Sequence, residues 1–181
     1  SNVIREQVET REVSQSVLQL GYYFPTRYFD EDYATLLVFN GLFGGFSHSR
    51  LFEELREKEG LAYTIGSCFD IYTGLLNVYA GIDAENQMKV LKLINKQLSH
   101  LKSGRFSETF LNRTKELIKT NVVLSGDSPK ATIERVYNDY HGIGSRGVDT
   151  LVKEVDNVCK ADVVAYSKEI ALQALYFLEG K

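Results

Sequence analysis

The sequence predicts an α+β domain whose helices pack on one face of a mostly antiparallel sheet. Segments with the polar and apolar alternation of strands lie near the beginning and at the end of the chain, and a long helical block separates them. A doubly wound parallel sheet would instead alternate strands and helices. Neither an internal repeat nor a Pro- or Gly-rich linker divides the chain. We therefore expect residues 1–181 to form one domain.

The first expected strand covers residues 13–24, which alternate polar and apolar side chains before Pro25 ends the pattern. A helix is expected next, over residues 30–45. Acidic residues at its start complement the helix dipole, and apolar residues then recur at helical spacing. Gly44 and Gly45 should break this helix, because glycine destabilises helical backbone.

A second helix is expected to start after Ser47 or Ser49, since either side chain can serve as the N-cap. It should run to about Lys58, with apolar residues facing a core at helical spacing. Gly60 suits the left-handed position that ends many helices, and the chain should then enter a strand.

A β-hairpin and the helical block follow. The hairpin strands are expected at 62–72 and 75–83, with a turn at 72–74. Helices are expected at 85–102, 107–124, from 129 to about 141, 148–157 and 161–171. Pro129 suits the first turn of its helix, and Ser128 or Asp127 can cap it. Residues 174–180 should close the domain as a strand.

Composition argues against several classes of function. A formal net charge of −3 disfavours general affinity for nucleic acid, which needs a basic surface. No stretch approaches the ~18 consecutive apolar residues of a membrane span. The N-terminus lacks the charged-then-apolar order of a signal peptide, so we expect a cytoplasmic location. The chain opens with Ser1-Asn2 and no initiator Met, which suggests a piece of a longer protein.

Metal-ligating residues are few and scattered. Cys68 and Cys159 lie far apart, outside any Cys-x-x-Cys pair, so neither a disulfide scaffold nor a cysteine-type zinc site is expected. The histidines, His48, His100 and His141, match neither His-Glu-x-x-His nor His-x-x-Glu-His. We therefore expect this chain to bind no metal by itself.

The stretch GLFGGFSHSR, residues 41–50, has some likeness to a phosphate-binding glycine loop. No Gly-Lys-Ser/Thr follows it and no strand directly precedes it, so a tight turn between two helices explains the glycines better. A small-molecule enzyme that uses the glycine turn near 41–47 remains a minor alternative. A serine hydrolase is disfavoured, because the Gly-x-Ser-x-Gly motif is missing.

Arg56 and Tyr63 flank the expected junction between the second helix and the first hairpin strand. Taken singly, Arg56 fits a solvated helix face, beside an i,i+4 pair of Glu54 and Lys58. Tyr63 fits a half-buried strand aromatic. Taken together, a planar guanidinium and a phenol at one edge of the sheet could bind a peptide carbonyl, a carboxylate or a developing oxyanion. Local physics leaves these alternatives open.

The stretch GLFGGFSHSRLFEELREKEGLAYTIGS, residues 41–67, resembles the signature of the pitrilysin (insulinase-type, inverzincin) zinc metallopeptidases. Mitochondrial processing peptidase subunits share this signature. The similarity is strongest over residues 36–83, and the order of elements extends it loosely to the whole chain. The resemblance implies the two-layer fold of pitrilysin/LuxS-like metallohydrolases.

In that family, paired homologous domains face each other around a cavity. One domain carries His-x-x-Glu-His and zinc, and the other contributes an Arg and a Tyr to the substrate. The resemblance implies that this chain is the second, C-terminal-type half, inactive when isolated, with Arg56 and Tyr63 as substrate-binding residues. Its implied partners are a zinc-bearing domain, in the same chain or in a heterodimer, and a peptide substrate; neither nucleic acid nor membrane is implied.

A second hypothesis belongs to another class of function. Some relatives of these peptidases have lost catalysis and serve as scaffold or interaction subunits. A His-x-x-Glu-His motif in the neighbouring sequence would favour the peptidase, and its absence there would favour the scaffold.

Overall fold

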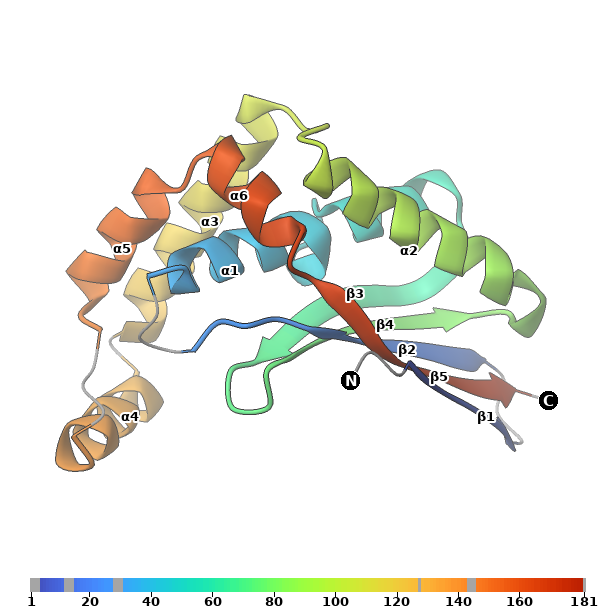
Figure 1. Cartoon of the computed structure of the whole chain (residues 1–181), viewed down its shortest axis with the longest axis horizontal. Coiled ribbons are helices and arrows are strands. Elements are labelled where there is room, and N and C mark those ends of the chain that lie inside the picture. Colours follow the sequence, from blue (N-terminus) through green and yellow to red (C-terminus); the bar gives the residue numbers. More distant parts are fainter. Residues whose placement is uncertain (1–3, 12–14, 28–30, 127, 143–145, 181) are drawn as a thin grey trace.

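The computed structural model describes residues 4–11, 15–27, 31–126, 128–142 and 146–180 of the chain (Figure 1). These residues form one five-stranded sheet with the strand order β1-β5-β2-β4-β3. The strands are β1 (Arg5–Arg11), β2 (Ser16–Tyr23), β3 (Ala62–Asp70), β4 (Leu75–Ile82) and β5 (Ala171–Gly180). Neighbouring strands are antiparallel except for β1 and β5, which are parallel. The predicted fold class is confirmed.

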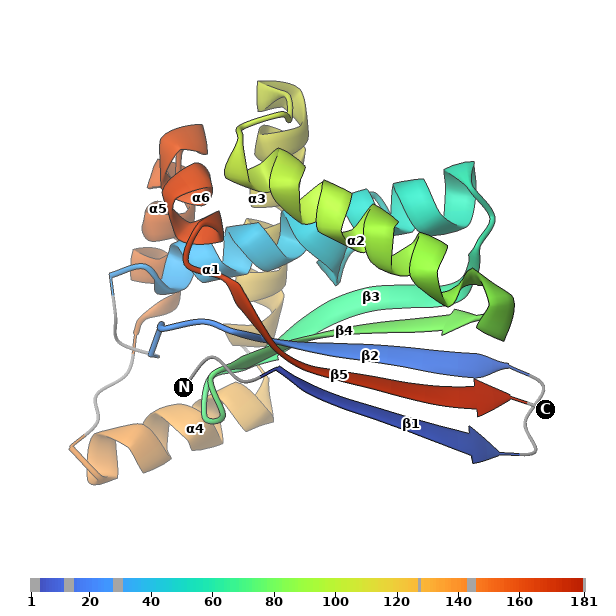
Figure 2. The ribbon, with the colours of Figure 1, turned by 45° about the vertical axis from the view of Figure 1, so that its right-hand side comes forward.

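Apart from α4, the helices form a layer on one face of this sheet, and the opposite face carries no helix layer in the described part of the chain (Figures 1 and 2). They are α1 (Tyr33–Asn40), η1 (Gly41–Gly45), η2 (Phe52–Lys58), η3 (Ala84–Asn86), α2 (Gln87–Lys102), α3 (Glu108–Gly126), α4 (Pro129–Tyr140), α5 (Val148–Asn157) and α6 (Lys160–Ser167). Helix α4 lies apart from the others, on the side of the sheet's uncovered face (Figure 2).

The core lies between the sheet and the helix layer. Alternate residues of β2 and β4 point into it, so Leu18, Tyr22 and Val78 are almost fully buried. Phe39 and Phe43 cover them from α1 and η1, and the Tyr22 and Phe43 rings meet edge to face at 6.2 Å. Two sequence patterns predict this arrangement: side chains that alternate polar and apolar along the strands, and apolar residues at helical spacing in the helices that cover them.

Several boundary residues act as the sequence predicts. The Ser128 hydroxyl accepts a hydrogen bond from the Ala131 amide at 3.1 Å, and Pro129 occupies the first turn of α4. Gly60 has φ +61°, the left-handed conformation expected after a helix. Ser49 precedes its helix, but its buried hydroxyl has no hydrogen-bond partner among the described residues, so its side chain does not act as a cap. The alternative cap Asp127 and residues 13, 14 and 30 of the expected elements lie outside the described residues.

The sequence prediction misses strand β1. Its residues, REQVETR, are mostly polar and lack the apolar alternation of a strand with one buried face. The strand forms because the main chain of β5 offers it a parallel partner, from Arg5 opposite Ala174 to Arg11 opposite Gly180. Edge strands carry little pattern of their own, because they bury little side-chain area.

Two predicted boundaries are wrong in detail. Helix α6 ends at Ser167 rather than at 171, and β5 begins at Ala171, three residues earlier than predicted. The first helix ends at Gly45, as expected from Gly44 and Gly45, but its last part, Gly41–Gly45, is π-helical before the extended Phe46.

Candidate functional site

Helix η2 and strand β3 meet in a tight corner at one end of the sheet. Leu51 and Leu55 are fully buried and fix the helix against the core. The Leu61 amide donates to the Leu55 carbonyl at 2.8 Å, and Gly60 supplies the left-handed turn between them. The last turn of η2 is therefore held directly beside the first residues of β3.

Arg56 lies on the exposed side of η2, in its last turn. Its guanidinium carbon lies 4.9 Å from the centroid of the Phe52 ring, which is a cation–π contact. The predicted pair of Lys58 and Glu54 is present, with 3.7 Å between Nζ and Oε2. No hydrogen bond or ion pair of Arg56 is found within the described part of the chain, and its side chain is exposed.

Tyr63 occupies a β-bulge at the start of β3. Ala62 pairs with Ile82 of β4 and Thr64 pairs with Gly81, so Tyr63 is the extra residue of its strand. A bulge interrupts the alternation of a strand and re-aims side chains. Here it leaves two successive residues, Tyr63 and Thr64, both exposed, and 50% of the Tyr63 surface is accessible to solvent.

The Tyr63 hydroxyl has a defined partner. It donates a hydrogen bond of 3.0 Å to Oδ1 of Asp83, the residue that follows β4. This hydrogen bond, and then the negative charge of the carboxylate, raise the pKa of Tyr63. The phenol is therefore protonated near neutral pH, and its single donor is directed at Asp83.

Arg56 and Tyr63 thus lie at the same corner of the fold but contact different residues. Arg56 rests on Phe52 and Tyr63 bonds to Asp83, and no hydrogen bond links the two in the described part of the chain. A concave surface of about 480 Å³ is lined by Asp83 and by the carboxylates Glu85 and Glu179, and Tyr63 is not part of its lining. Sequence reasoning missed Asp83, because its contact with Tyr63 depends on the hairpin register together with the bulge.

Each histidine is engaged in local contacts. His48 is buried, with Nε2 at 2.8 Å from the Thr114 hydroxyl. His100 lies 2.9 Å from Nη2 of Arg50 through Nδ1, and the His141 ring packs on Tyr137. Among the described residues, no three His, Cys, Asp or Glu side chains gather closely enough to hold a metal ion.

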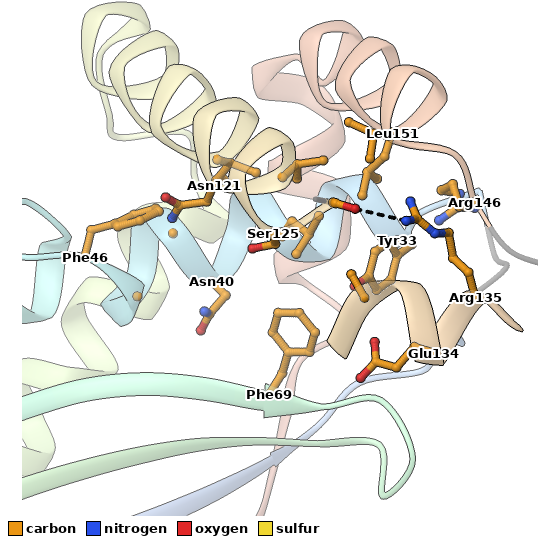
Figure 3. A pocket seen from close by; sticks show the side chains of 18 residues that line it. Tyr33, Asn40, Phe46, Phe69, Asn121, Ser125, Glu134, Arg135, Arg146 and Leu151 are labelled. Atoms are coloured by element: carbon orange, nitrogen blue, oxygen red, sulfur yellow. Dashed lines mark hydrogen bonds between the residues drawn. The ribbon is translucent and has the colours of Figure 1, made fainter. Parts of the chain in front are cut away.

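A separate cleft of about 420 Å³ opens between α1, α3, α4 and α5 (Figure 3). Tyr33, Phe46 and Phe69 form apolar parts of its wall, and Arg135 and Arg146 bring two guanidinium groups to it. Gly41 and Gly45 also line this cleft, whereas Arg56 and Tyr63 do not. The cleft is therefore distinct from the corner that the sequence singles out.

Close packing explains the glycines of η1. A Cβ atom on Gly44 would lie 2.8 Å from the backbone nitrogen of Ser67, and one on Gly45 would lie 2.9 Å from the side-chain nitrogen of Asn40. Ser67 and Asn40 are themselves joined by a 2.7 Å hydrogen bond. Gly44 thus allows η1 to approach β3, and Gly45 leaves room for Asn40 of α1; these packing roles require no phosphate ligand.

Comparison with known proteins assigns the chain to a family. Residues 3–118 match the family model described as "Peptidase M16 inactive domain". A Bacillus subtilis protein named "probable inactive metalloprotease YmfF" is 36% identical over 176 residues, which cover 97% of this chain and 41% of that protein. The Mycobacterium leprae protein named "uncharacterized zinc protease ML0855" is 27% identical, over 88% of this chain and 36% of the relative.

Solved structures agree on the fold. A conserved protein from Enterococcus faecalis V583 superposes with a TM-score of 0.95 and 36% identity, over 100% of this chain and 43% of that one. The inactive peptidase domain of a Bordetella parapertussis protein, 20% identical, gives a TM-score of 0.72 over 90% of this chain and 93% of that one.

The chain therefore spans less than half the length of the two relatives and of the Enterococcus protein. In the described part of the chain, no helix is both long and apolar enough to cross a bilayer. The resemblance to the zinc metallopeptidases is confirmed, and the chain belongs to the family of peptidase M16 inactive domains.

Proposed function

We propose that this chain is the substrate-binding, non-catalytic half of a zinc metalloendopeptidase, in which Arg56 and Tyr63 bind the peptide opposite a zinc-bearing partner domain. The observation that carries the proposal is the corner between η2 and β3, where the exposed side chains of Arg56 and of the bulge residue Tyr63 both lie. The family match to an inactive domain supports a role that depends on a partner.

Arg56 is suited to bind main-chain oxygens. Its guanidinium is a permanent cation with donors in a planar fork, which matches carbonyl and carboxylate geometry. The contact with Phe52 rests one face of the guanidinium on an aromatic ring and leaves the edges for ligand atoms. A peptide carbonyl, or the oxyanion that develops from it, would therefore be held by charge-assisted hydrogen bonds.

Tyr63 is suited to a role that changes during binding. While its hydroxyl donates to Asp83, only the lone pairs of the phenol oxygen face solvent, so the group can accept a bond from a substrate amide. To donate to an oxyanion, the hydroxyl has to turn away from Asp83. Asp83 would then hold the ring in position before substrate arrives, which reduces the entropy cost of binding.

The edge of the sheet supports a peptide as the ligand class. β3 is the terminal strand of the sheet in the described residues, with β4 as its hydrogen-bonded neighbour. Main-chain groups on the outer edge of such a strand can pair with an extended peptide. A peptide lying along this edge would pass Tyr63.

The described side chains of this domain do not fit a zinc site of their own. His48, His100 and His141 have separate partners, and no cluster of ligands forms around any of them. In the proposal the metal is therefore carried by the partner domain, as the zinc-protease names of relatives suggest.

The test combines this chain with its zinc-bearing partner domain and measures kcat/KM for peptide hydrolysis. Arg56→Ala and Tyr63→Phe should each lower kcat/KM by about 30- to 1000-fold, because a donor to the transition state is typically worth ~2–4 kcal/mol. Lys58→Ala, in the same helical turn, and Tyr72→Phe, in the exposed β3–β4 turn, are matched controls that should leave the rate unchanged.

A change within about threefold for both Arg56→Ala and Tyr63→Phe, under ~1 kcal/mol, would refute the assignment of these residues. Unfolding midpoints of the variants separate loss of binding from loss of structure, and they should match wild type because both side chains are exposed.

A catalytically inactive scaffold of the same fold is the second candidate. The observation in its favour is the name of the Bacillus subtilis relative, a probable inactive metalloprotease, at 36% identity. A stable complex with the partner that hydrolyses no peptide would support the scaffold, whereas zinc-dependent hydrolysis by the complex would reject it.

A further inference from the structure

The cleft between α1, α3, α4 and α5 combines a volume of about 420 Å³ with an apolar wall (Figure 3). This volume falls in the range of sites that hold small molecules. The apolar wall is made of side chains that pack against the core but are only partly buried: Tyr33, Leu37, Phe46, Phe69, Val122 and Leu151. Their uncovered surface is apolar area that a ligand can remove from water.

Arg135 of α4 brings a cation with unused hydrogen-bond donors to the cleft. Its Nη2 donates to the Gly126 carbonyl at 3.0 Å and to the Thr132 hydroxyl at 3.3 Å, and these bonds fix the side chain. Nε and Nη1 have no hydrogen-bond partner in the described part of the chain, and no carboxylate there pairs with this guanidinium. A half-buried guanidinium with such donors suits a ligand carboxylate, which accepts two parallel hydrogen bonds.

The other charged side chains at the cleft differ in their surroundings. Arg146 is already paired, with 3.3 Å between its Nε and Oε2 of Glu154, and its guanidinium carbon lies 5.3 Å from the centroid of the Tyr33 ring. Glu134 is exposed and forms no ion pair with any described residue. Among the described lining residues, Arg135 and Glu134 thus remain without a counter-charge. This combination favours a ligand that carries both charges over a phosphate or another anion.

Side-chain amides lie across the cleft from these two charges. Figure 3 shows Asn40 of α1 and Asn121 of α3 opposite Glu134 and Arg135 of α4. The Oδ1 atom of Asn40 accepts a hydrogen bond of 2.7 Å from the Ser67 hydroxyl, so its Nδ2 atom is left as a donor. An amide side chain offers both donors and acceptors, as a peptide group does. The polar part of the cleft therefore matches a peptide better than it matches a fatty acid.

We propose that this cleft binds a short apolar peptide with both ends free, such as a dipeptide. Arg135 binds the carboxylate, Glu134 binds the ammonium group, and a large apolar side chain covers the Phe69 ring. The proposal goes beyond the proposed function, because neither Arg56 nor Tyr63 lines this cleft. Binding here requires neither zinc nor the partner domain, so it can be measured separately from peptide hydrolysis.

The test measures binding of the dipeptide Leu-Phe to the full chain by isothermal titration calorimetry at about pH 7, where both ends of the dipeptide are charged. N-acetyl-Leu-Phe lacks the ammonium group and Leu-Phe amide lacks the carboxylate, so each should bind with a Kd at least about tenfold higher. Gly-Gly carries both charges without apolar side chains, and it should show no saturable binding. A Kd for any of these three ligands equal to that of Leu-Phe would overturn the proposal.

Variants of the lining locate the site. Arg135→Gln should raise the Kd of Leu-Phe at least about tenfold and leave that of Leu-Phe amide unchanged, because the amide has no carboxylate for the guanidinium to bind. Glu134→Gln should weaken Leu-Phe binding in the same way and leave N-acetyl-Leu-Phe unaffected, and the fold should persist because this side chain is exposed. Lys130→Gln, on the same helix but outside the lining, is the matched control and should change each Kd by less than about twofold.

The corner variants separate this proposal from the proposed function. Arg56→Ala and Tyr63→Phe should bind Leu-Phe as wild type does, and a loss of binding in them would place the dipeptide at the corner and overturn the proposal. No saturable binding of Leu-Phe at about 10 mM would also overturn it, as would wild-type affinity in both Arg135→Gln and Glu134→Gln. Either of these last two results would leave the assignment of Arg56 and Tyr63 intact.

Discussion

Tyr63 donates its hydroxyl hydrogen to Asp83 across the first bulged pair of the β-hairpin, with 3.0 Å between Oη and Oδ1. Tyr63 lies in β3 and Asp83 directly follows β4, and the bulge places the Tyr63 ring on the solvent side, within hydrogen-bonding distance of Asp83. The hydrogen bond to Asp83 therefore fixes the orientation of Tyr63 although its ring stays exposed. The same contact couples the acidity of the phenol to the charge of the carboxylate.

Asp83→Asn should lower the pKa of Tyr63 toward the ordinary tyrosine value. The carboxylate raises that pKa first by accepting the phenol hydrogen bond and then by its charge, and the amide keeps a weaker acceptor but no charge. The pKa can be followed by NMR titration of ring-labelled tyrosines, with Tyr63→Phe identifying the signal. An identical Tyr63 titration in wild type and Asp83→Asn would show that the contact does not persist in solution.

Gly44→Ala should destabilise the domain by about 1–3 kcal/mol, the usual cost of forcing an extra group into a packed site. The added Cβ would lie 2.8 Å from the Ser67 backbone nitrogen, and a β-strand backbone cannot move aside cheaply. Gly147→Ala is the matched control, because its nearest neighbour would be 3.9 Å away and its φ is −65°. Urea unfolding measures both, and equal stabilities would contradict the packing role of Gly44.

The sequence predicts those parts of the fold in which one residue determines local geometry. The Ser128 cap, the Gly60 turn and the hairpin follow from local rules on capping, left-handed backbone and alternation. The polar strand β1 and the bulge at Tyr63 depend on partner strands distant in sequence, so local pattern does not reveal them.

In the candidate site, too, some features follow from local sequence and others depend on contacts between distant residues. Family resemblance selects Arg56 and Tyr63, and their positions at the corner follow from the helix stop at Gly60. Asp83 was missed because its role arises from the hairpin register and the bulge together. In α4, Ile133, Val136, Tyr137 and Tyr140 recur at helical spacing, but periodicity does not say whether such residues face the domain's own core, and here they are exposed.

Tyr22→Phe should leave the domain as stable as wild type or more stable by up to about 1 kcal/mol. The Tyr22 hydroxyl is buried in the core and has no hydrogen-bond partner among the described residues, so its removal relieves an unsatisfied polar group. Burial also raises the pKa of Tyr22 far above its usual range. Tyr166→Phe is the matched comparison, because the Tyr166 hydroxyl lies 2.8 Å from that of Thr26.

Tyr166→Phe should cost about 0.5–1.5 kcal/mol, the typical net worth of one hydrogen bond, and it leaves Thr26 without that partner. Thermal or urea unfolding of the two variants in parallel gives the comparison. A larger loss for Tyr22→Phe than for Tyr166→Phe would contradict the hydrogen-bond pattern of the core.

In their neutral forms, His48 and His100 connect residues 48–50, just before η2, to the neighbouring helices. His48 contacts Thr114 of α3, and His100 of α2 contacts Arg50. Burial, followed by the charge of Arg113, lowers the pKa of His48, and the Glu53 carboxylate opposes this only in part. For His100, burial lowers the pKa first, and the Arg50 guanidinium lowers it further. Arg50 can only donate, so Nδ1 of His100 must be the acceptor in their 2.9 Å contact, and protonation of that nitrogen breaks it.

The domain should therefore lose stability as the pH falls below the unfolded-state value of 6.5 for histidine. Both folded-state pKa values are lowered, so the unfolded chain binds more protons below pH 6.5; the contribution is complete above that value and declines toward the lowered values. Urea unfolding at about pH 7.5 and about pH 5.5 should show a lower midpoint in acid. In His48→Gln and His100→Gln the difference should shrink, because the variant side chains do not titrate. An acid shift of the same size in wild type and both variants would assign the pH dependence to other groups.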